Sequence, residues 1–509
     1  MNRTKLSALN AVSALLLTLT NGLLGIVVTR LILSHYGSDF NGINSTVNQI
    51  INVLLILEGG FTLASNVALF GPVSKNETET ANGILAATRT KFRKIGVVFF
   101  AVGIVVSVAY ALVAKTQLRR EFVFTVLFMT VVPQAVNLYF TTTYRVLLQT
   151  QQKEYIISGF TALTIGLGHL TNICIILLNG QMWLIRFVTM IYALLNCMLI
   201  SVYTRKKNRF IDFAVKPRGE LIKGTNDVMA QKITGVIYTS WPIVFLSISS
   251  SGGSLLASVY AVYNNIFVMI KALLHGLIDA PRLGFGQMLT EKDKDEVWPT
   301  FKEYEFIAVV FVFIMMTTAC GLILPFIRFY TQGVTDVNYY DIMIATLMVL
   351  IGTVEMLHIP SGHIINMSGN FRISKIFQII ACVVLIASMS ILGSIFDIYG
   401  MLFSLLFVAI LLAVCEIGFV HTRFFFEKLK EYIFMVMPFL VAGVFLAWIE
   451  MKISIGIDSI LSFIVLACIY CVINMIFAFA LGFAFDRRDT KNLLNRAKLL
   501  VTKYIKKDE

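Results

Sequence analysis

The fold is decided by apolar stretches such as residues 305–326, which read EFIAVVFVFIMMTTACGLILPF and carry one charged residue, Glu305. A helix needs about 20 mostly apolar residues to cross the hydrocarbon core of a bilayer, and this stretch supplies them. Apolar runs of similar length recur between short polar breaks, and we predict fourteen membrane spans. They lie near 7–33, 42–70, 95–114, 122–142, 155–178, 183–203, 228–249, 255–280, 305–326, 339–360, 373–393, 399–420, 432–449 and 458–484.

The composition of the whole chain agrees with a membrane protein. Of its 509 residues, 57% are hydrophobic and only 14% are charged, whereas soluble domains contain about 25% charged residues. These proportions exclude a soluble enzyme and a disordered chain, and they predict an all-α polytopic membrane protein. The seven cysteines all lie in apolar runs, which argues against disulfides and a zinc site. The sequence contains no Walker-type phosphate loop and no hydrolase motif, so we predict no enzymatic activity and no cofactor or metal.

The basic residues predict which ends of the spans face the cytoplasm. Lys and Arg number 42 against 29 Asp and Glu, which gives a net charge of +13. If the N-terminus lies inside, 33 Lys and Arg residues fall on inner segments and seven on outer ends. Cytoplasmic loops of membrane proteins carry such an excess. We therefore predict that both termini lie inside, and that the positive charge sets topology and attracts anionic lipid rather than nucleic acid.

A shift of 215 residues aligns two parts of the sequence. Gly37 then falls on Gly252, and the pair Phe70–Gly71 falls on Phe285–Gly286. The offset contains six spans, an even number, so the two halves run in the same direction, as in some alternating-access transporters. We predict the following organisation: an N-terminal six-helix lobe at 1–204, a basic linker at 205–225, a C-terminal six-helix lobe at 226–422, two extra helices at 423–485, and a basic amphipathic tail at 486–509 that lies on the inner leaflet.

The eighth predicted span carries a polar face. Ionisable groups at bilayer depth usually face a cavity or a partner, so two interpretations remain open: a water-filled cavity, or a polar seam in which Lys271, His275 and Asp279 pair with one another. Lys271, about three turns from the inner end, is the strongest single candidate for contact with a ligand. The residues at helical spacing on this face are Tyr260, Asn264, Lys271, His275, Asp279 and Arg282.

The second predicted span is also polar. Glu58 lies near its middle, before Gly59–Gly60, and is a candidate for coupling to an ion, as is Asp279 of the eighth span; the alternative is a protonated Glu58 bonded to nearby hydroxyls. Four asparagines form one stripe on this span: Asn41, Asn44, Asn48 and Asn52.

Basic and acidic residues near span ends are harder to interpret. Arg30 ends the first span near the outer side, where it either faces a cavity or reaches the interface. Glu355 and His358 share one face of the tenth span but lie near the inner surface. Arg145 closes the fourth span, and we interpret it as a charge that sets topology.

Residues 30–52, RLILSHYGSDFNGINSTVNQIIN, resemble the first loop of polysaccharide-exporting flippases of the multidrug/oligosaccharidyl-lipid/polysaccharide (MOP) superfamily. Tyr36–Gly37 and the triplet Phe40–Asn41–Gly42 occupy the Leu-Gly-x-x-x-[Phe/Tyr]-Gly-like pattern of that family, with Tyr36 where Leu is usual. Residues 57–96 and 258–289 are similar to the Gram-positive branch of the family. The motifs are loose, and they identify the superfamily better than the substrate.

The resemblance implies a Wzx-like flippase that moves an undecaprenyl-pyrophosphate-linked oligosaccharide across the bacterial cytoplasmic membrane by alternating access, for capsule, O-antigen or another surface polysaccharide. It implies two lobes around a central cavity. The implied partners are the polyprenyl-pyrophosphate-linked glycan, membrane lipids and polysaccharide-assembly proteins. On this basis Arg30 and Lys271 would contact the head group and Arg282 would lie at the inner mouth. His275 would also bind the substrate. The candidates for contact with sugar hydroxyls are Asn44, Asn48, Tyr260 and Asn264.

Other functions stay open at this point. A flippase for lipid II or a teichoic-acid precursor would need similar chemistry. An ion-coupled drug exporter of the same superfamily favours an acidic cavity, whereas the interior predicted for this chain is more basic than acidic. A membrane polymerase or ligase for the same glycan would need longer outer loops. A non-transporting scaffold would not need the polar face of the eighth span.

Overall fold

The computed structural model describes residues 3–222, 225–279, 281–452 and 459–495. Over these residues the regular structure is helical throughout, without a strand. The chain packs into two compact units. Unit 1 comprises Met1–Ala261 and Gly333–Val337, and unit 2 comprises Val262–Gln332 and Asn338–Glu509.

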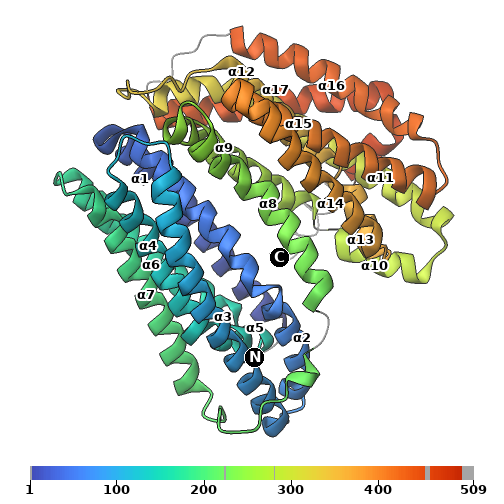
Figure 1. Ribbon diagram of the computed structural model, residues 1–509. Coiled ribbons are helices and arrows are strands. Elements are labelled where there is room, and N and C mark those ends of the chain that lie inside the picture. The colour runs from blue at the N-terminus through green and yellow to red at the C-terminus, as the bar shows by residue number, and fades with distance from the viewer. Residues whose placement is uncertain (1–2, 223–224, 280, 453–458, 496–509) are drawn as a thin grey trace, which may run out of the picture. The chain divides into compact units, whose positions relative to one another are not determined.

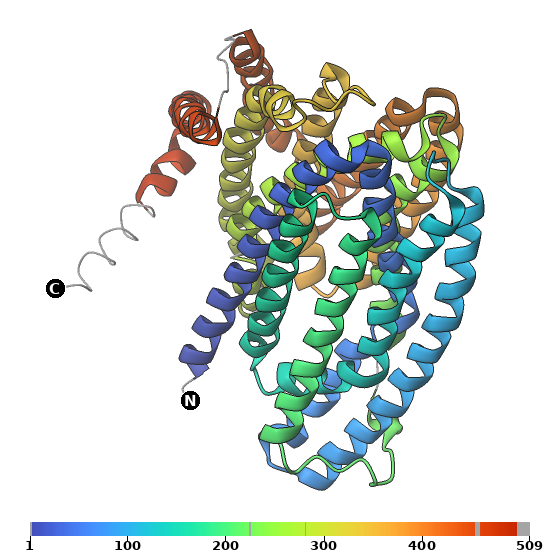
Figure 2. The same cartoon turned by 90° about the vertical axis from the view of Figure 1, so that its left-hand side faces the viewer.

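Unit 1 is a bundle of long helices, coloured blue to green in Figure 1 and seen from another side in Figure 2. α3 packs against α4, α6 packs against α1 and α7, and α8 packs along α1. Phe40, Phe92 and Phe99 are fully buried in its apolar core. The bounds are α1 Arg3–Leu54, α2 Phe61–Ser74, α3 Thr78–Val113, α4 Arg120–Val136, α5 Thr142–Thr150, α6 Glu154–Leu177, α7 Met182–Lys207 and α8 Thr225–Ser249.

Glycines interrupt the beginning of unit 1. Gly37 has φ 83 and ψ 172, which glycine adopts without a Cβ clash, and α1 bends at this residue. Gly59 and Gly60 are both left-handed and separate the short turn Leu55–Glu58 from α2. The predicted second span, 42–70, is therefore two helices rather than one, because successive left-handed residues cannot continue a right-handed helix.

Unit 2 is built around α11, which contacts α12, α16 and α17. A helix covered on several sides is apolar all round, and this explains the pattern of residues 305–326. Phe306 and Phe439 meet in the core beside it. The bounds are α9 Gly253–Ile278, which begins in unit 1, α10 Arg282–Glu291, α11 Lys294–Tyr330, α12 Ile342–Leu357, α13 Ile359–Met367, α14 Phe371–Ser388, α15 Ser394–Phe419, α16 Leu429–Lys452 and α17 Ile460–Phe485.

Eleven helices among the described residues are long and apolar enough to cross a membrane. Phe371–Phe424 covers two predicted spans, and Val12–Glu58 covers most of the first predicted span and the beginning of the second. Within Phe371–Phe424, Asp397 has φ 49 and ψ −124 and marks a break inside α15. A shorter apolar helix, Ile233–Ser249, coincides with the seventh predicted span. The all-helical fold class is confirmed, whereas the number fourteen stays a prediction.

The order of elements recurs near the predicted offset of 215 residues. The long helix α3 begins at Thr78 and its counterpart α11 begins at Lys294. Each is preceded by a short helix, α2 or α10, that carries the paired Phe–Gly dipeptide. This recurrence agrees with an internal repeat. The lobes at 1–204 and 226–422 and their parallel orientation stay predictions, and by packing α8 belongs to unit 1.

The predicted tail, 486–509, is described as far as residue 495. Residues 487–495 are helical, and the remainder lies outside the described residues. Thr490 is fully buried, and a Cβ placed on Gly482 of α17 would lie 2.5 Å from its hydroxyl oxygen. The beginning of the tail therefore packs closely against α17.

Candidate functional site

Unit 1 contains a polar cavity of about 480 Å³, which we call the unit 1 cavity. It is lined by α1, α4, the turn that follows α4, α5, α6 and α7. Three basic residues line it: Arg145, His169 and Arg186. None of the described lining residues is Asp or Glu. The other polar lining side chains are amides and hydroxyls: Asn21, Asn44, Asn48, Gln134, Asn137, Thr161, Thr164, Asn172, Thr189, Tyr192 and Asn196.

A backbone irregularity shapes one wall of this cavity. Pro133 lies inside α4 and is followed by the π-helical turn Asn137–Thr141. Proline removes a helical hydrogen bond, and π-turns occur frequently at functional sites. Thr141 donates to the carbonyl of Cys197 on α7 at 3.4 Å, so the turn is held against that helix. The irregular backbone thus lies where it lines a polar cavity rather than lipid.

Arg186 is the most firmly held cation of the unit 1 cavity. The residue is only 5% exposed to solvent. Nη1 donates to Oδ1 of Asn48 at 3.1 Å, and Nη2 donates to the carbonyl of Asn44. Both acceptors are neutral, and the buried Nε has no hydrogen-bond partner among the described residues. A buried guanidinium without an acidic partner is unfavourable, which an anionic ligand would offset.

Other lining groups of the unit 1 cavity also have buried atoms without partners in the described part of the chain. These are Nε of Arg145 and Nε2 of His169, together with the amide oxygens of Asn172 and Asn196. Two guanidinium groups and an imidazole on three different helices therefore line one cavity. Such a set supplies directional donors for phosphate or carboxylate oxygens.

The sequence did not single out these cations. Arg145, interpreted above as a topology charge, and Arg186, one of the seven basic residues on predicted outer ends, both line the unit 1 cavity. For Arg186 a signal was present, since it follows Met182–Ile185 within a predominantly apolar run. His169 lies in the middle of the fifth predicted span and was overlooked. Arg145, His169 and Arg186 come together through the packing of three helices. The periodicity of the sequence carries no information about that packing.

The predicted site residues of unit 1 divide into two groups. Asn44 and Asn48 line the cavity and bind Arg186. Arg30 is half-buried on α1, two residues from the lining residues Val28 and Ile32. Residues two apart on a helix do not share a face, so Arg30 points to a different side of α1.

The remaining predicted residues of unit 1 lie in other surroundings. Glu58 ends the short turn before Gly59 and accepts a hydrogen bond from Thr62. That contact matches the alternative in which hydroxyls bind this carboxyl group. Tyr260 is buried on the first part of α9. A role for either residue in transport stays a prediction.

The polar face of α9 meets acidic and imidazole side chains within unit 2. Nζ of Lys271 lies 2.8 Å from a carboxylate oxygen of Glu355 on α12. Nδ1 of His275 lies 3.2 Å from Asp279, whose same oxygen is 3.4 Å from Nε2 of His363. Within this face, Lys271 pairs with Glu355 rather than with its own helix, and the choice between a seam and a cavity stays open.

Two further residues were predicted on this face. Asn264 is half-buried on α9, and Arg282 is exposed at the first residue of α10. Direct binding of a ligand by Lys271, His275, Asn264 or Arg282 stays a prediction.

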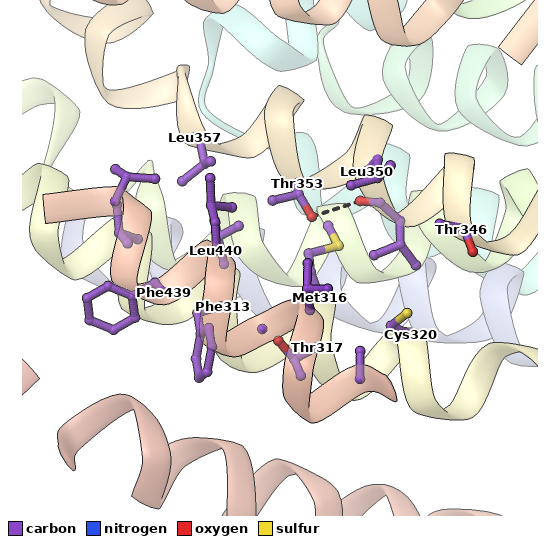
Figure 3. Close-up of a pocket in the computed structure, with 17 residues that line it drawn as sticks. Phe313, Met316, Thr317, Cys320, Thr346, Leu350, Thr353, Leu357, Phe439 and Leu440 are labelled. Atoms are coloured by element: carbon purple, nitrogen blue, oxygen red, sulfur yellow. Dashed lines mark hydrogen bonds between the residues drawn. The ribbon is translucent and has the colours of Figure 1, made fainter. Parts of the chain in front are cut away.

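Unit 2 contains an apolar pocket of about 170 Å³ between α11, α12 and α16, shown in Figure 3. Phe313, Met316, Leu350 and Leu440 are among its lining residues. Thr353 donates to the carbonyl of Val349 at 2.8 Å, so its hydroxyl is satisfied within its own helix. The pocket is therefore chemically suited to a hydrocarbon chain, in contrast to the unit 1 cavity.

Comparisons with known proteins identify the fold. No protein-family model matches the chain, and no curated protein matches it in sequence. The chain is similar to the structure of lipid II flippase MurJ in an inward closed conformation, with a TM-score of 0.67, 12% identity, and coverage of 94% of this chain and 99% of that chain. It is also similar to an inward-facing multidrug resistance MATE family transporter of the MOP superfamily, with a TM-score of 0.64, 13% identity, and coverage of 86% and 96%.

A third similar structure is a MOP superfamily transporter from Pyrococcus furiosus, whose description reports a binding pocket of reverse polarity. Its TM-score is 0.57 at 13% identity, with coverage of 88% of this chain and 97% of that chain. The chain thus has the fold of these solved transporters along most of its length. Together with its apolar helices, this fold makes it a multi-pass membrane protein.

Proposed function

We propose that this chain is a flippase that moves a polyprenyl-pyrophosphate-linked oligosaccharide across the bacterial cytoplasmic membrane by alternating access. The observation that carries the proposal is the unit 1 cavity, which presents Arg145, His169 and Arg186 with no carboxylate among its described lining residues. The fold, shared with a lipid flippase and with drug transporters, supports transport but does not choose the cargo. The charge of the cavity favours an anionic head group.

The chemistry of a diphosphate fits these residues. A diphosphate carries about two negative charges, and arginine binds phosphate oxygens through two parallel N–H donors. Attraction between charges is stronger in an enclosed site of low dielectric than in water. Arg186 is held in place by Asn48 and Asn44, so its orientation is set before a ligand arrives. The surrounding amides and hydroxyls have the donor and acceptor pattern that sugar hydroxyls require.

The lipid portion of the cargo would need an apolar environment. The pocket of unit 2 in Figure 3 supplies one between α11, α12 and α16, and an isoprenoid segment fits its chemistry. Much of the polyprenyl chain would remain in the surrounding bilayer. Polysaccharide-assembly proteins as partners, and orientation with both termini inside, belong to the same proposal.

The competing cargoes differ in charge. A cationic drug would meet two arginines in the unit 1 cavity and no lining carboxylate among the described residues, so drug export is disfavoured. Lipid II and diphosphate-linked teichoic-acid precursors share the pyrophosphate and remain alternatives that the cavity does not separate from other lipid-linked saccharides. A polymerase or ligase would need catalytic groups, and the cavity supplies cations and amides instead.

Translocation by proteoliposomes tests the proposal. The cargo is a fluorescent polyprenyl-pyrophosphate saccharide, and a neutral glycolipid with the same chain serves as the second cargo. We expect the wild type to move the diphosphate but not the neutral lipid. Arg186→Gln should move the diphosphate at least about tenfold more slowly, because loss of a charged hydrogen bond costs about 1.5–3 kcal/mol.

The matched control is Arg119→Gln, which alters an exposed arginine outside the cavity. Its rate should equal that of the wild type, and both variants should elute as the wild type does in gel filtration. Equal rates for Arg186→Gln and wild type would contradict the role of the cavity. Failure of the wild type to move lipid-linked diphosphates of several saccharides, lipid II included, would contradict the flippase itself.

A further inference from the structure

Unit 2 contains a broken helix surrounded by histidine–carboxylate contacts. α12 ends at Leu357, His358 is the residue at the break, and α13 restarts with Pro360 in its first turn. Proline cannot donate a helical hydrogen bond and disfavours helical backbone in the residue before it.

The most deeply buried contact joins Glu305 of α11 to His421. Both side chains are only 2% exposed. Nε2 of His421 lies 3.2 Å and 3.1 Å from the two carboxylate oxygens of Glu305. Ser361 of α13 donates to the same carboxylate at 3.4 Å. One acidic group thus connects α11, the segment after α15 and the helix that follows the break.

His421 lies on an irregular stretch of backbone and among aromatic rings. It lies on the π-helical turn Val420–Phe424, a type of irregularity that is common at functional sites. Its ring is 5.1 Å from that of Trp298 and 5.4 Å from that of Tyr432. Nδ1 of His421 is buried and has no hydrogen-bond partner among the described residues.

A second histidine–carboxylate contact lies at the break itself. Nδ1 of His358 is 2.8 Å from Oε2 of Glu416 on α15. Gly362 leaves room for this carboxylate, since a Cβ at that position would lie 2.9 Å from Oε2. On the following turn, His363 contacts Tyr304 at 2.9 Å and Asp279 at 3.4 Å. The start of α13 is thus held by acidic groups from several elements.

We propose that the Glu305–His421 pair is a proton-binding site that takes up one proton on Nδ1 of His421. Before uptake, neutral His421 donates its Nε2–H to the Glu305 carboxylate, and the Nδ1 lone pair is free to accept a proton. After uptake, the imidazolium keeps that hydrogen bond and the net charge of the pair changes from −1 to zero. The proton comes from water, and no other bond forms or breaks.

Charge compensation in a buried place favours the proton-loaded state. A carboxylate removed from water is costly unless a cation accompanies it. The other charged or titratable groups that interact electrostatically with Glu305 are Lys302 and Tyr304 of the same helix and Tyr432 of α16. Because Ser361 binds the same carboxylate, the protonation state of the pair reaches the α12–α13 break. Coupling of cargo movement to this proton rests on the proposed function, whereas binding of the proton does not.

Trp298 provides a direct readout of proton binding in the purified full-length protein. The chain has four tryptophans, and replacing Trp183, Trp241 and Trp448 by Phe leaves the one that touches His421. A protonated imidazole quenches a neighbouring indole, so acidification should quench the emission reversibly. His421→Gln should lose this quenching, whereas His35→Gln, which alters a histidine of unit 1, should keep it.

A second variant keeps the test decisive if His421→Gln does not fold. Glu305→Gln retains the shape of the side chain but removes the negative charge that stabilises the imidazolium, so quenching should develop only at lower pH than in the parent. Glu305→Asp should restore part of the effect. Parent emission that does not respond to pH, or identical curves for the parent and whichever variants fold, would overturn the proton site.

Transport then separates this inference from the proposed function. In proteoliposomes that move the labelled cargo, an imposed pH gradient should change the wild-type rate severalfold and leave the rate of His421→Gln unchanged. An equal response in both proteins would overturn coupling through this pair. If no cargo moves at all, the Trp298 titration still decides whether the pair binds a proton.

Discussion

Gly42 shows at the residue scale how closely two helices of unit 1 approach. A Cβ at this position would collide with the backbone carbonyl of Ser254 at the start of α9. This gives a physical reason for a glycine at the end of the motif that resembles the flippases. Gly42→Ala should destabilise the protein by about 1–3 kcal/mol, the usual cost of overpacking, and lower its thermal unfolding midpoint in detergent.

The control for this substitution is Gly25→Ala on the same helix, where a Cβ would meet nothing within 4 Å. Its unfolding midpoint should equal or exceed that of the wild type, because alanine favours a helix more than glycine does. An unchanged midpoint for Gly42→Ala would show that the two helices can separate at no cost.

The pair Lys271–Glu355 gives a second prediction at this scale. The side chains of Lys271 and Glu355 are 24% and 12% exposed. Removal of either one would therefore leave the other as an unpaired charge in largely buried surroundings. We expect Lys271→Met to destabilise the protein, and the double variant Lys271→Met/Glu355→Gln to recover part of that loss, with a coupling energy of about 1–3 kcal/mol. Chemical unfolding of the two single variants and the double variant measures it.

The same double variant separates the two interpretations of the α9 face. If Lys271 serves only the seam, the double variant should move cargo at the wild-type rate. If Lys271 also contacts cargo, transport should stay impaired although stability is recovered. A coupling energy near zero would argue against the ion pair itself.

At the scale of elements, the breaks within long helices matter most. Asp397, inside α15, has φ 49 and ψ −124. Residues other than glycine adopt this backbone conformation only with strain. Asp397→Gly should therefore leave stability unchanged or raise it by up to about 1 kcal/mol. Asp397→Val should lower it, because a β-branched side chain fits this backbone least well. Thermal unfolding of both variants tests this, and equal stability of the two would contradict a strained break.

The sequence predicted elements better than sites, for a physical reason. Apolar runs identify helices such as α11 because burial in lipid or protein demands apolar residues along the whole segment. The Glu305–His421 contact joins residues 116 positions apart, and it depends on how α11 packs, which periodicity does not encode. Asn44 and Asn48 were found because they form a stripe on one helix. Arg186, their partner, was not, because one arginine near a span end has the same pattern as a topology charge.

At the scale of the whole molecule, the distribution of basic residues predicts orientation. Of the Lys and Arg residues, 33 fall on predicted inner segments and seven on outer ends. In a chain without its seven native cysteines, Lys216→Cys should react with an impermeant maleimide only from the cytoplasmic side. Gln117→Cys should react only from outside, and both should react after permeabilisation. Reaction of Lys216→Cys from outside would reverse the predicted topology.

The charge of the unit 1 cavity has an electrical consequence for a transport cycle. If the cargo is the proposed lipid diphosphate, it leaves the protein while Arg145 and Arg186 stay, so the cavity is close to neutral when loaded and positive when empty. Reorientation of the loaded carrier is then nearly insensitive to membrane potential. The empty carrier moves positive charge, which gains about 2.3 kcal/mol per elementary charge per 100 mV across the full field. An inside-negative potential would therefore drive the return stroke and reset the protein for the next lipid.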